Sequence, residues 1–300
     1  MNTKLLLLIS LLLAAYSARA QRDFSQVEIK VVPVKGNIYM LQGAGGNIGL
    51  YAGETTAMLI DNQFAPLAEK IQAAAKSVKD VPIRVLINTH LHGDHTGGNQ
   101  PFAEGGSLIL AQENVRSRMS KEQVNEFFNR TTPPSPAIAL PVITFGDDMH
   151  FNFFEEEIAV YHYAAAHTDG DAVIYFKSSN VIHTGDVFVT YGFPFVDAYN
   201  GGSINGFIHF LDKILGLIND ETIVIPGHGD LSTKADVRRF RDRLTTIRDR
   251  VYAGYQAGKS VDDILKEKPT AEFDEEWGKG FIKGEDFVKL IYLSFDNPEK

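Results

Sequence analysis

Hydrophobic and polar positions along the first half of the chain form short runs that predict strands. Four apolar or alternating runs, punctuated by glycines, cover residues 27–34, 37–42, 48–52 and 56–61. Residues 65–78 instead place apolar side chains three or four positions apart, which is helical spacing. The run 82–88 is mostly apolar, as expected of a strand buried on both faces.

The second half continues with both kinds of element. A strand at 107–111 and a helix at 113–128 are predicted next, and residues 131–141, with four prolines, predict a surface crossing. Strands resume at 142–145, 149–153, 158–163, 172–176, 181–184 and 221–225. Ser203 can cap a helix that runs through Leu217, and helices fill most of the remainder, the longest at 234–255. Because strands and helices lack strict alternation, the order favours two packed sheets flanked by helices over a doubly wound sheet.

The first 20 residues have the pattern of a secretory leader. Lys4 precedes a run of 11 residues, Leu5 to Ala15, that is apolar apart from Ser10, and Ala18-Arg19-Ala20 supplies a small-x-small cleavage site. A membrane span needs about 18 apolar residues, so this run is too short to be one. We therefore expect cleavage after Ala20, a periplasmic or secreted product, no stable membrane anchor, and a single domain over residues 21–300.

Charge and cysteine content narrow the chemistry. The 300 residues include 29 Lys and Arg and 38 Asp and Glu, a net charge of −9. Loss of Lys4 and Arg19 with the leader would leave 27 basic residues and a net charge of −11. Nucleic-acid binding needs clustered basic residues and is not expected. With no cysteine, the chain has no disulfide, thiolate ligand or cysteine nucleophile, so any metal must be held by His, Asp or Glu.

The strongest chemical signal lies directly after the predicted strand at 82–88. Of nine histidines, His90, His92 and His95 fall within six residues, with Asp94 among them. In an extended segment, His-x-His places two imidazoles on the same side, where both can reach one metal ion. The chain can turn at Gly93, so that Asp94 and His95 point at a second, adjacent ion. A mixture of imidazole and carboxylate donors suits Zn²⁺.

Three later turns also place a candidate ligand after a predicted strand. They carry His167, Asp186 and His228, each in a glycine-containing turn. Loops held at strand ends by a rigid sheet are common positions for ligands. Each turn is a weak signal alone, but the three together in this order are strong. No ligand role is expected for three other histidines, His150, His162 and His209.

These motifs, in this order, resemble those of the metallo-β-lactamase-fold hydrolase superfamily. The resemblance covers roughly residues 27 to 228. Segment 88–98 (NTHLHGDHTGG) resembles the family signature, and the strand-turn 59–61 (LID) resembles its first motif. His167, Asp186 and His228 match the third, fourth and fifth motifs. The resemblance implies the α/β class, as a four-layer αββα sandwich with the site along one edge of the two sheets.

The resemblance also implies two zinc ions and assigns their ligands. The first ion would be held by His90, His92 and His167, the second by Asp94, His95 and His228, with Asp186 bridging both. Such a bridging carboxylate belongs to the hydroxyacylglutathione-hydrolase-like and lactonase-like branches. Asp61 would orient a ligand histidine, the alternative being a plain cap at the strand end.

The activity implied is zinc-dependent hydrolysis of a small molecule. Two zinc ions that share a water lower its pKa, and the resulting hydroxide attacks a carbonyl carbon. Asp94 is the candidate catalytic group, placed to accept the proton and pass it to the leaving group. The bond would be an amide, ester or lactone, a β-lactam included. Alternatives are a thioester hydrolase of the hydroxyacylglutathione type, an iron-dependent sulfur oxidoreductase on the same fold, and a metal-dependent binding protein without catalysis.

The sequence says less about the identity of the substrate than about the type of reaction. The absence of cysteine excludes the lactamase branches whose second zinc uses a thiolate, and residues 187–190 lack the lysine that holds a substrate carboxylate in many true lactamases. Candidate pocket residues are aromatic: Phe64, Phe188, Tyr191, Phe193, Phe195 and Tyr199. Core packing explains these aromatic residues equally well.

Overall fold

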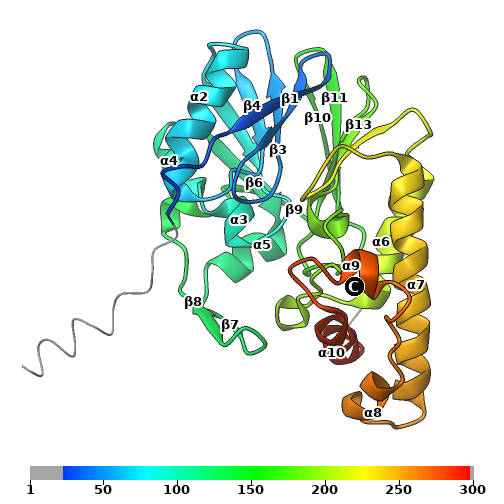
Figure 1. The fold of residues 1–300 in the computed structure, drawn as a ribbon. Helices are drawn as coiled ribbons and strands as arrows, with labels where there is room; N and C mark the ends of the chain where they lie inside the picture. The colour runs from blue at the N-terminus through cyan, green and yellow to red at the C-terminus, as the bar shows by residue number, and fades with distance from the viewer. Residues whose placement is uncertain (1–22, 298–300) are drawn as a thin grey trace, which may run out of the picture.

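Two β-sheets pack face to face, and helices cover the outer face of each (Figure 1). This is the four-layer αββα arrangement expected from the sequence. The computed structural model describes residues 23–297, so the predicted leader lies outside the described residues. Within them, no helix is long and apolar enough to cross a membrane.

The first sheet has seven strands in the order β1-β2-β3-β4-β5-β6-β9. Their bounds are β1 (Lys30–Lys35), β2 (Ile38–Gln42), β3 (Ile48–Ala52), β4 (Ala57–Ile60), β5 (Ile83–Ile87), β6 (Leu108–Gln112) and β9 (Ile143–Phe145). β1 to β4 are antiparallel, whereas β4, β5, β6 and β9 are parallel. Parallel neighbours need crossovers, and these carry η1 (Ala65–Leu67), α2 (Ala68–Val78), α3 (Gly93–Thr96), α4 (Asn99–Glu104), α5 (Glu113–Met119) and η2 (Ala137–Ala139).

The second sheet has five strands in the order β10-β11-β12-β13-β14. Their bounds are β10 (Asp148–Phe153), β11 (Glu156–Tyr161), β12 (Val173–Phe176), β13 (Val181–His183) and β14 (Ile223–Ile225). Only the β13–β14 pair is parallel, and α6 (Ile204–Leu217) lies in its crossover. The predicted cap is confirmed, because the Ser203 side chain accepts a hydrogen bond from the backbone N–H of Gly206.

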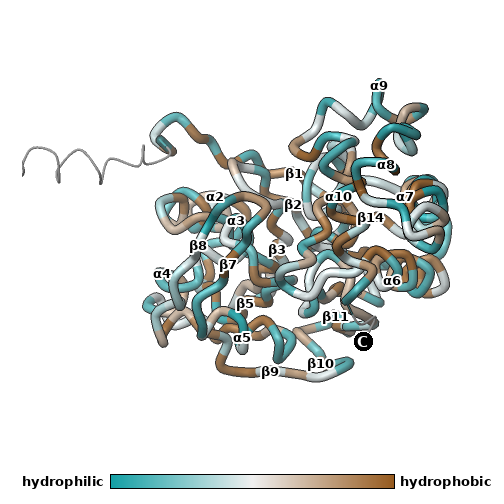
Figure 2. The backbone as a smooth tube through the Cα atoms, turned by 90° about the horizontal axis from the view of Figure 1, so that it is seen from below, coloured by the Kyte–Doolittle hydropathy of each residue, from teal (hydrophilic) through white to brown (hydrophobic). Residues whose placement is uncertain are grey.

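Side chains that alternate along the strands build the layers. On β4, Met58 and Ile60 belong to the cluster between the sheets, whereas Leu59 belongs to the cluster under α2. The third cluster joins the second sheet to α6 and to α7 (Lys234–Gln256). Figure 2 shows the same order, with the strands lying between α2 and α5 on one side and α6 and α7 on the other.

The predicted helix at 113–128 is wrong beyond its first two turns. α5 ends at Met119, and the chain then forms a hairpin of β7 (Gln123–Asn125) and β8 (Arg130–Thr132). The Asn125 side chain accepts a hydrogen bond from the backbone N–H of Phe128, and Asn129 adopts a left-handed φ of 47°. Asparagine favours both features of a turn, and local turn chemistry here overrides the helical spacing.

The C-terminal helices return to the second sheet. They are α8 (Val261–Lys266), α9 (Asp274–Trp277) and α10 (Gly284–Ser294), and two short turns, η3 (Gly185–Val187) and η4 (Ala198–Asn200), precede α6. Between α9 and α10, Ile282 forms an isolated antiparallel bridge with Phe193. This bridge brings the C-terminal segment to the loop that follows η3.

Candidate metal centre

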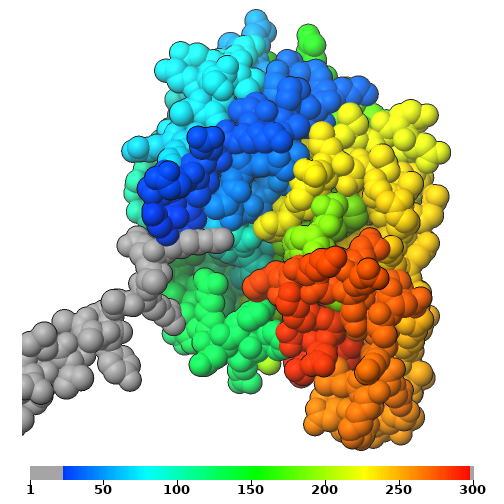
Figure 3. All heavy atoms as spheres, viewed as in Figure 1, coloured from blue at the N-terminus to red at the C-terminus, as the bar shows by residue number. Residues whose placement is uncertain are grey.

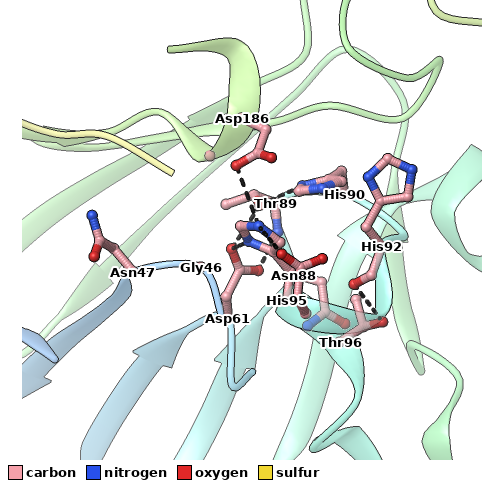
Figure 4. Close-up of polar contacts among 12 residues, drawn as sticks. Gly46, Asn47, Asp61, Asn88, Thr89, His90, His92, His95, Thr96 and Asp186 are labelled. Carbon is pink, nitrogen blue, oxygen red and sulfur yellow. Dashed lines mark hydrogen bonds and ion pairs between the residues drawn. The ribbon is translucent and has the colours of Figure 1, made fainter. Parts of the chain in front are cut away.

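The candidate ligands lie where strands of both sheets end at one edge. His90 and His92 follow β5, Asp94 and His95 lie in α3, His167 follows β11, Asp186 lies in η3 after β13, and His228 follows β14. The seven side chains span 139 sequence positions, from 90 to 228, yet fall into three overlapping groups whose ligand atoms lie within 4.8 Å of one another. Figure 4 shows several of them converging below Asp186.

The first group consists of His90, His92 and His167. Nδ1 of His92 lies 2.8 Å from Nε2 of His167. The other nitrogen of His167 donates to the backbone oxygen of Phe195, which leaves Nε2 turned toward the group. The sequence predicted these three as one set, and the structure brings them together.

The second group consists of Asp94, His95 and His228. Nε2 of His228 lies 3.2 Å from Oδ2 of Asp94 and 3.3 Å from Nε2 of His95. Asp186 lies between the two groups: its Oδ1 is 3.2 Å from Nε2 of His95, and its Oδ2 is 3.7 Å from Nε2 of His167. A carboxylate in this place can bind an ion on each side.

Nε2 of His90, a buried atom at the centre of the site, has no hydrogen-bond partner. Oδ1 of Asp186 also forms no hydrogen bond, and the polar atom beside it is Nε2 of His95 at 3.2 Å, itself a candidate ligand atom. A buried polar group left unsatisfied is costly, and a metal ion is a common reason for one. The donor set of imidazoles and carboxylates also fits a borderline divalent ion such as Zn²⁺. The residues present therefore fit a metal centre.

Asp61 holds the signature loop in place from the end of β4. Its Oδ2 accepts hydrogen bonds from Nδ1 of His95 (2.8 Å) and from the hydroxyl of Thr89 (2.7 Å), and its Oδ1 accepts one from the backbone N–H of Thr89. Asp61 is fully buried and has a left-handed φ of 62°. This geometry goes beyond a plain strand cap, because the bond fixes which nitrogen of His95 faces the ligand group (Figure 4).

Asp197 orients the ring of His92 as Asp61 orients that of His95. No sequence pattern predicted this role for Asp197. Its Oδ2 lies 2.8 Å from Nε2 of His92, which leaves Nδ1 of that ring facing His167. The backbone N–H of Asp197 also donates to the carbonyl of His167. Asn125 and Asn200 donate to the same carboxylate. The residue is 105 positions from His92 and belongs to no motif, so only the fold could reveal it.

Burial and neighbouring charges shift the pKa values of the candidate ligands, downward for some side chains and upward for others. Burial, with the charges of neighbouring histidines, lowers the pKa of His90 well below its usual value and that of His167 to about 4. Burial also opposes charge on His95, but the carboxylates of Asp186, Asp94 and Asp61 outweigh it and raise its pKa well above the usual value. The carboxyl pKa of Asp94 falls despite burial, because His95 and His228 stabilise its charge.

Two glycines permit the loops to approach the centre closely. A Cβ at Gly46 would lie 2.1 Å from Cε1 of His95, and one at Gly227 would lie 2.0 Å from Oδ1 of Asp186. No side chain fits at those distances. The glycines before β3 and after β14 are therefore part of how the sequence builds the site.

The six aromatic residues predicted to line a pocket do not share one environment. Phe188 and Phe193 are buried and pack on Phe240 and Trp277, so core packing was the correct interpretation for them. Phe195 stacks 5.7 Å from the His92 ring. Of the remaining three, Tyr191 has its ring 5.5 Å from that of His228, whereas Phe64 has its ring 5.0 Å from that of Phe24 and Tyr199 lies in η4.

Comparison with known proteins places this geometry in a family. The family model described as "Metallo-beta-lactamase superfamily" matches residues 41–228. The alpha subunit of 2,4-dinitroanisole O-demethylase from Nocardioides sp. (strain JS1661) is 22% identical over 87% of this chain and 77% of its own length. The hydroxyacylglutathione hydrolase GloC of Haemophilus influenzae is 27% identical over 56% of this chain and 78% of its own length. The solved metallo-beta-lactamase from Pontibacter korlensis superposes with a TM-score of 0.61 at 15% identity, over 73% of this chain and 99% of that chain.

Proposed function

The chain belongs to the metallo-beta-lactamase superfamily, whose members of this type are hydrolases. We propose that it is a two-zinc hydrolase of a small-molecule ester, lactone or amide. The observation that carries the proposal is the pair of ligand groups joined through Asp186. Seven histidine and aspartate side chains supply enough donors for two ions.

The donor chemistry supports zinc and supports two ions. A site with imidazole and carboxylate donors and no thiolate suits Zn²⁺ well. When bound, zinc would polarise a substrate carbonyl and lower the pKa of water toward neutrality. An iron-dependent oxidoreductase on this fold uses fewer ligands, so His95 and His228, which complete the second group, favour hydrolysis.

Asp94 is the residue best placed to move a proton. Its carboxylate stays ionised, because His95 and His228 hold its pKa below the usual value. Its side chain is 34% exposed, whereas that of Asp186 is 8% exposed, so Asp94 can meet both water and substrate. It would accept a proton at a carboxylate oxygen as the nucleophile attacks and return it to the leaving group.

Tyr191 would supply a hydrogen bond to the substrate. Burial, with the charges of Asp186 and Asp94, raises its phenol pKa well above 10. The group therefore keeps its proton at neutral pH and can donate a hydrogen bond to an oxygen that gains negative charge during hydrolysis. Its ring lies 5.5 Å from that of His228, on the side of the second ligand group.

No basic side chain of the described residues is bonded to the candidate ligands. Within residues 23–297, no lysine or arginine forms a hydrogen bond or ion pair with any of the seven candidate ligands. A carboxylate on the substrate would therefore meet the positive charge of the bound ions rather than a Lys or Arg held by the ligands. Thioester hydrolysis is a second candidate, because a hydroxyacylglutathione hydrolase is among the relatives and Asp186 is placed between the groups.

A hydrolysis screen of the zinc-loaded protein tests the proposal. The panel contains an acyl-homoserine lactone, a neutral aryl ester, a chromogenic cephalosporin, a carbapenem and a glutathione thioester. We expect turnover of the lactone or ester, and none by a His92→Ala variant prepared in the same way. No turnover of any substrate by zinc-loaded, folded protein would contradict the proposal.

Export completes the proposed function. Its support is the sequence pattern of residues 1–20 alone. Fractionation of cells that express the full chain, with sequencing of the mature N-terminus, is expected to find a periplasmic or secreted product that begins at Gln21. A product that retains Met1 in the cytosol would contradict it.

A further inference from the structure

Three phenylalanines from distant segments form a continuous row of rings that ends at the metal centre. The ring of Phe128 lies 5.1 Å from that of Phe195 and 5.4 Å from that of Phe281. Phe128 lies on the β7–β8 hairpin, Phe195 follows η3, and Phe281 lies between α9 and α10. We call these three residues the aromatic wall.

The inner end of the aromatic wall touches the first ligand group directly. Phe195 lies with its ring 5.7 Å from His92 and 5.8 Å from His167. A molecule whose scissile bond reaches these histidines would therefore place its neighbouring atoms along the wall.

The outer end of the aromatic wall is open to water. Phe128 is 38% exposed and Phe281 is 67% exposed. Figure 3 shows the hairpin (green) and the segment around residue 280 (orange) on the same face of the molecule. Exposed apolar side chains that adjoin one another, rather than lying singly, are a feature of binding sites.

Backbone and side-chain contacts fix the segments that carry both exposed rings. The Asn125 side chain accepts a hydrogen bond from the backbone N–H of Phe128 and donates one to Asp197, the residue bound to His92. Phe281 precedes Ile282, which is buried and bridges to Phe193. The rings are thus held beside the centre by specific contacts.

The rings of the wall take no part in the cation–π contacts of the described residues. Within residues 23–297, cation–π contacts involve Arg243 and Arg250 with the rings of Phe273 and Trp277, and none involves a ring of the wall. An uncharged apolar group is the occupant that such rings bind best.

We propose that the aromatic wall binds an apolar acyl chain or aromatic group attached to the hydrolysed bond, and so sets substrate preference. The inference rests on the proposed function, since it needs the reacting group at the metal centre. The substrate class it names is an ester, lactone or amide with a large apolar substituent on one side of the bond.

Two hydroxamates that share one metal-binding group test this without requiring turnover. Acetohydroxamate reaches only the metal centre, whereas octanohydroxamate adds an apolar chain. For the zinc-loaded protein, calorimetry is expected to give octanohydroxamate a dissociation constant at least about tenfold lower, because the added methylenes leave water.

Single substitutions in the aromatic wall show whether its rings provide the extra affinity for octanohydroxamate. Phe128→Ala and Phe281→Ala are each expected to remove most of the gain for octanohydroxamate and to leave acetohydroxamate binding unchanged. Phe154→Ala is the matched control, because Phe154 is 41% exposed and lies between β10 and β11, away from the wall. Thermal unfolding of each variant checks that it is folded. Lactones with butanoyl and dodecanoyl chains give the same comparison in KM.

The outcomes separate the two proposals. If the wild type binds both hydroxamates equally, the proposed role of the aromatic wall is wrong. The same holds if the extra affinity for octanohydroxamate survives in both wall variants. Neither result would contradict the metal centre. Failure of acetohydroxamate to bind zinc-loaded protein would overturn the proposed function and this inference with it. A wild-type dimer that Phe281→Ala converts to monomer without altering octanohydroxamate binding would show that the wall is an interface between two copies.

Discussion

Nε2 of His92 lies 2.8 Å from Oδ2 of Asp197, and this contact decides which nitrogen of the ring faces the centre. The hydrogen bond to Asp197 and the surrounding carboxylates raise the pKa of His92 although burial opposes it. Because Asp197 also holds the backbone of His167, one residue braces two of the three candidate ligands of the first group.

Asp197→Asn is therefore expected to weaken metal binding at the first group about 10- to 100-fold, a typical effect of removing a carboxylate that orients a ligand histidine. Competition with a zinc chelator measures the affinity. Asp148→Asn is the control, since it alters an exposed Asp–His pair, with Asp148 3.1 Å from His150, on β10. An unchanged affinity in Asp197→Asn would refute the bracing role.

Asp61→Asn should act on the second ion. Asparagine tolerates the left-handed φ of this position, so the backbone is kept while the carboxylate that holds His95 is lost. We expect the variant to bind the first zinc normally and the second about 10- to 100-fold more weakly. Two equally tight zinc ions in Asp61→Asn would contradict this assignment.

Tyr191→Phe separates catalysis from metal binding. The change removes one hydrogen-bond donor and keeps the ring beside His228. We predict a fall in kcat of about 100-fold, at the lower end of the range for loss of a donor to a developing oxyanion, with unchanged zinc content. A kcat equal to the wild type would mean that the phenol takes no part in the reaction.

Zinc binding should release protons at neutral pH. In the metal-free protein the pKa of His95 is raised well above 6.5, so this ring is protonated at pH 7, whereas His90 and His167, whose pKa values are lowered, are already neutral. A metal ion needs the neutral ring, so the proton on His95 must leave. Calorimetry at pH 7 in buffers of different ionisation enthalpy is expected to show a buffer-dependent heat for the wild type. A heat that is the same in every buffer would contradict the protonated state of His95.

The motifs predict side chains that the structure brings together, because each candidate ligand lies next to a strand end or within one short loop. Asp61 and the segment 88–98 could be recognised for this reason. Asp197 could not, since its role depends on a loop that packs against His92 from 105 positions away. Phe128 was hidden for another reason: the helical spacing of residues 113–128 masked a hairpin that asparagine side chains stabilise. Phe281 lies in a segment with no chemical motif, and tertiary packing alone places it beside Phe128.

The metal content of the purified chain tests the central claim most directly. After reconstitution with zinc and removal of excess metal, elemental analysis should find two zinc ions per wild-type chain, and the same sample should hydrolyse a lactone or ester. A His92→Ala sample should lose zinc from the first group and lose turnover. A wild-type chain that holds no transition metal, or a single iron ion with no hydrolysis after zinc is added, would contradict the account.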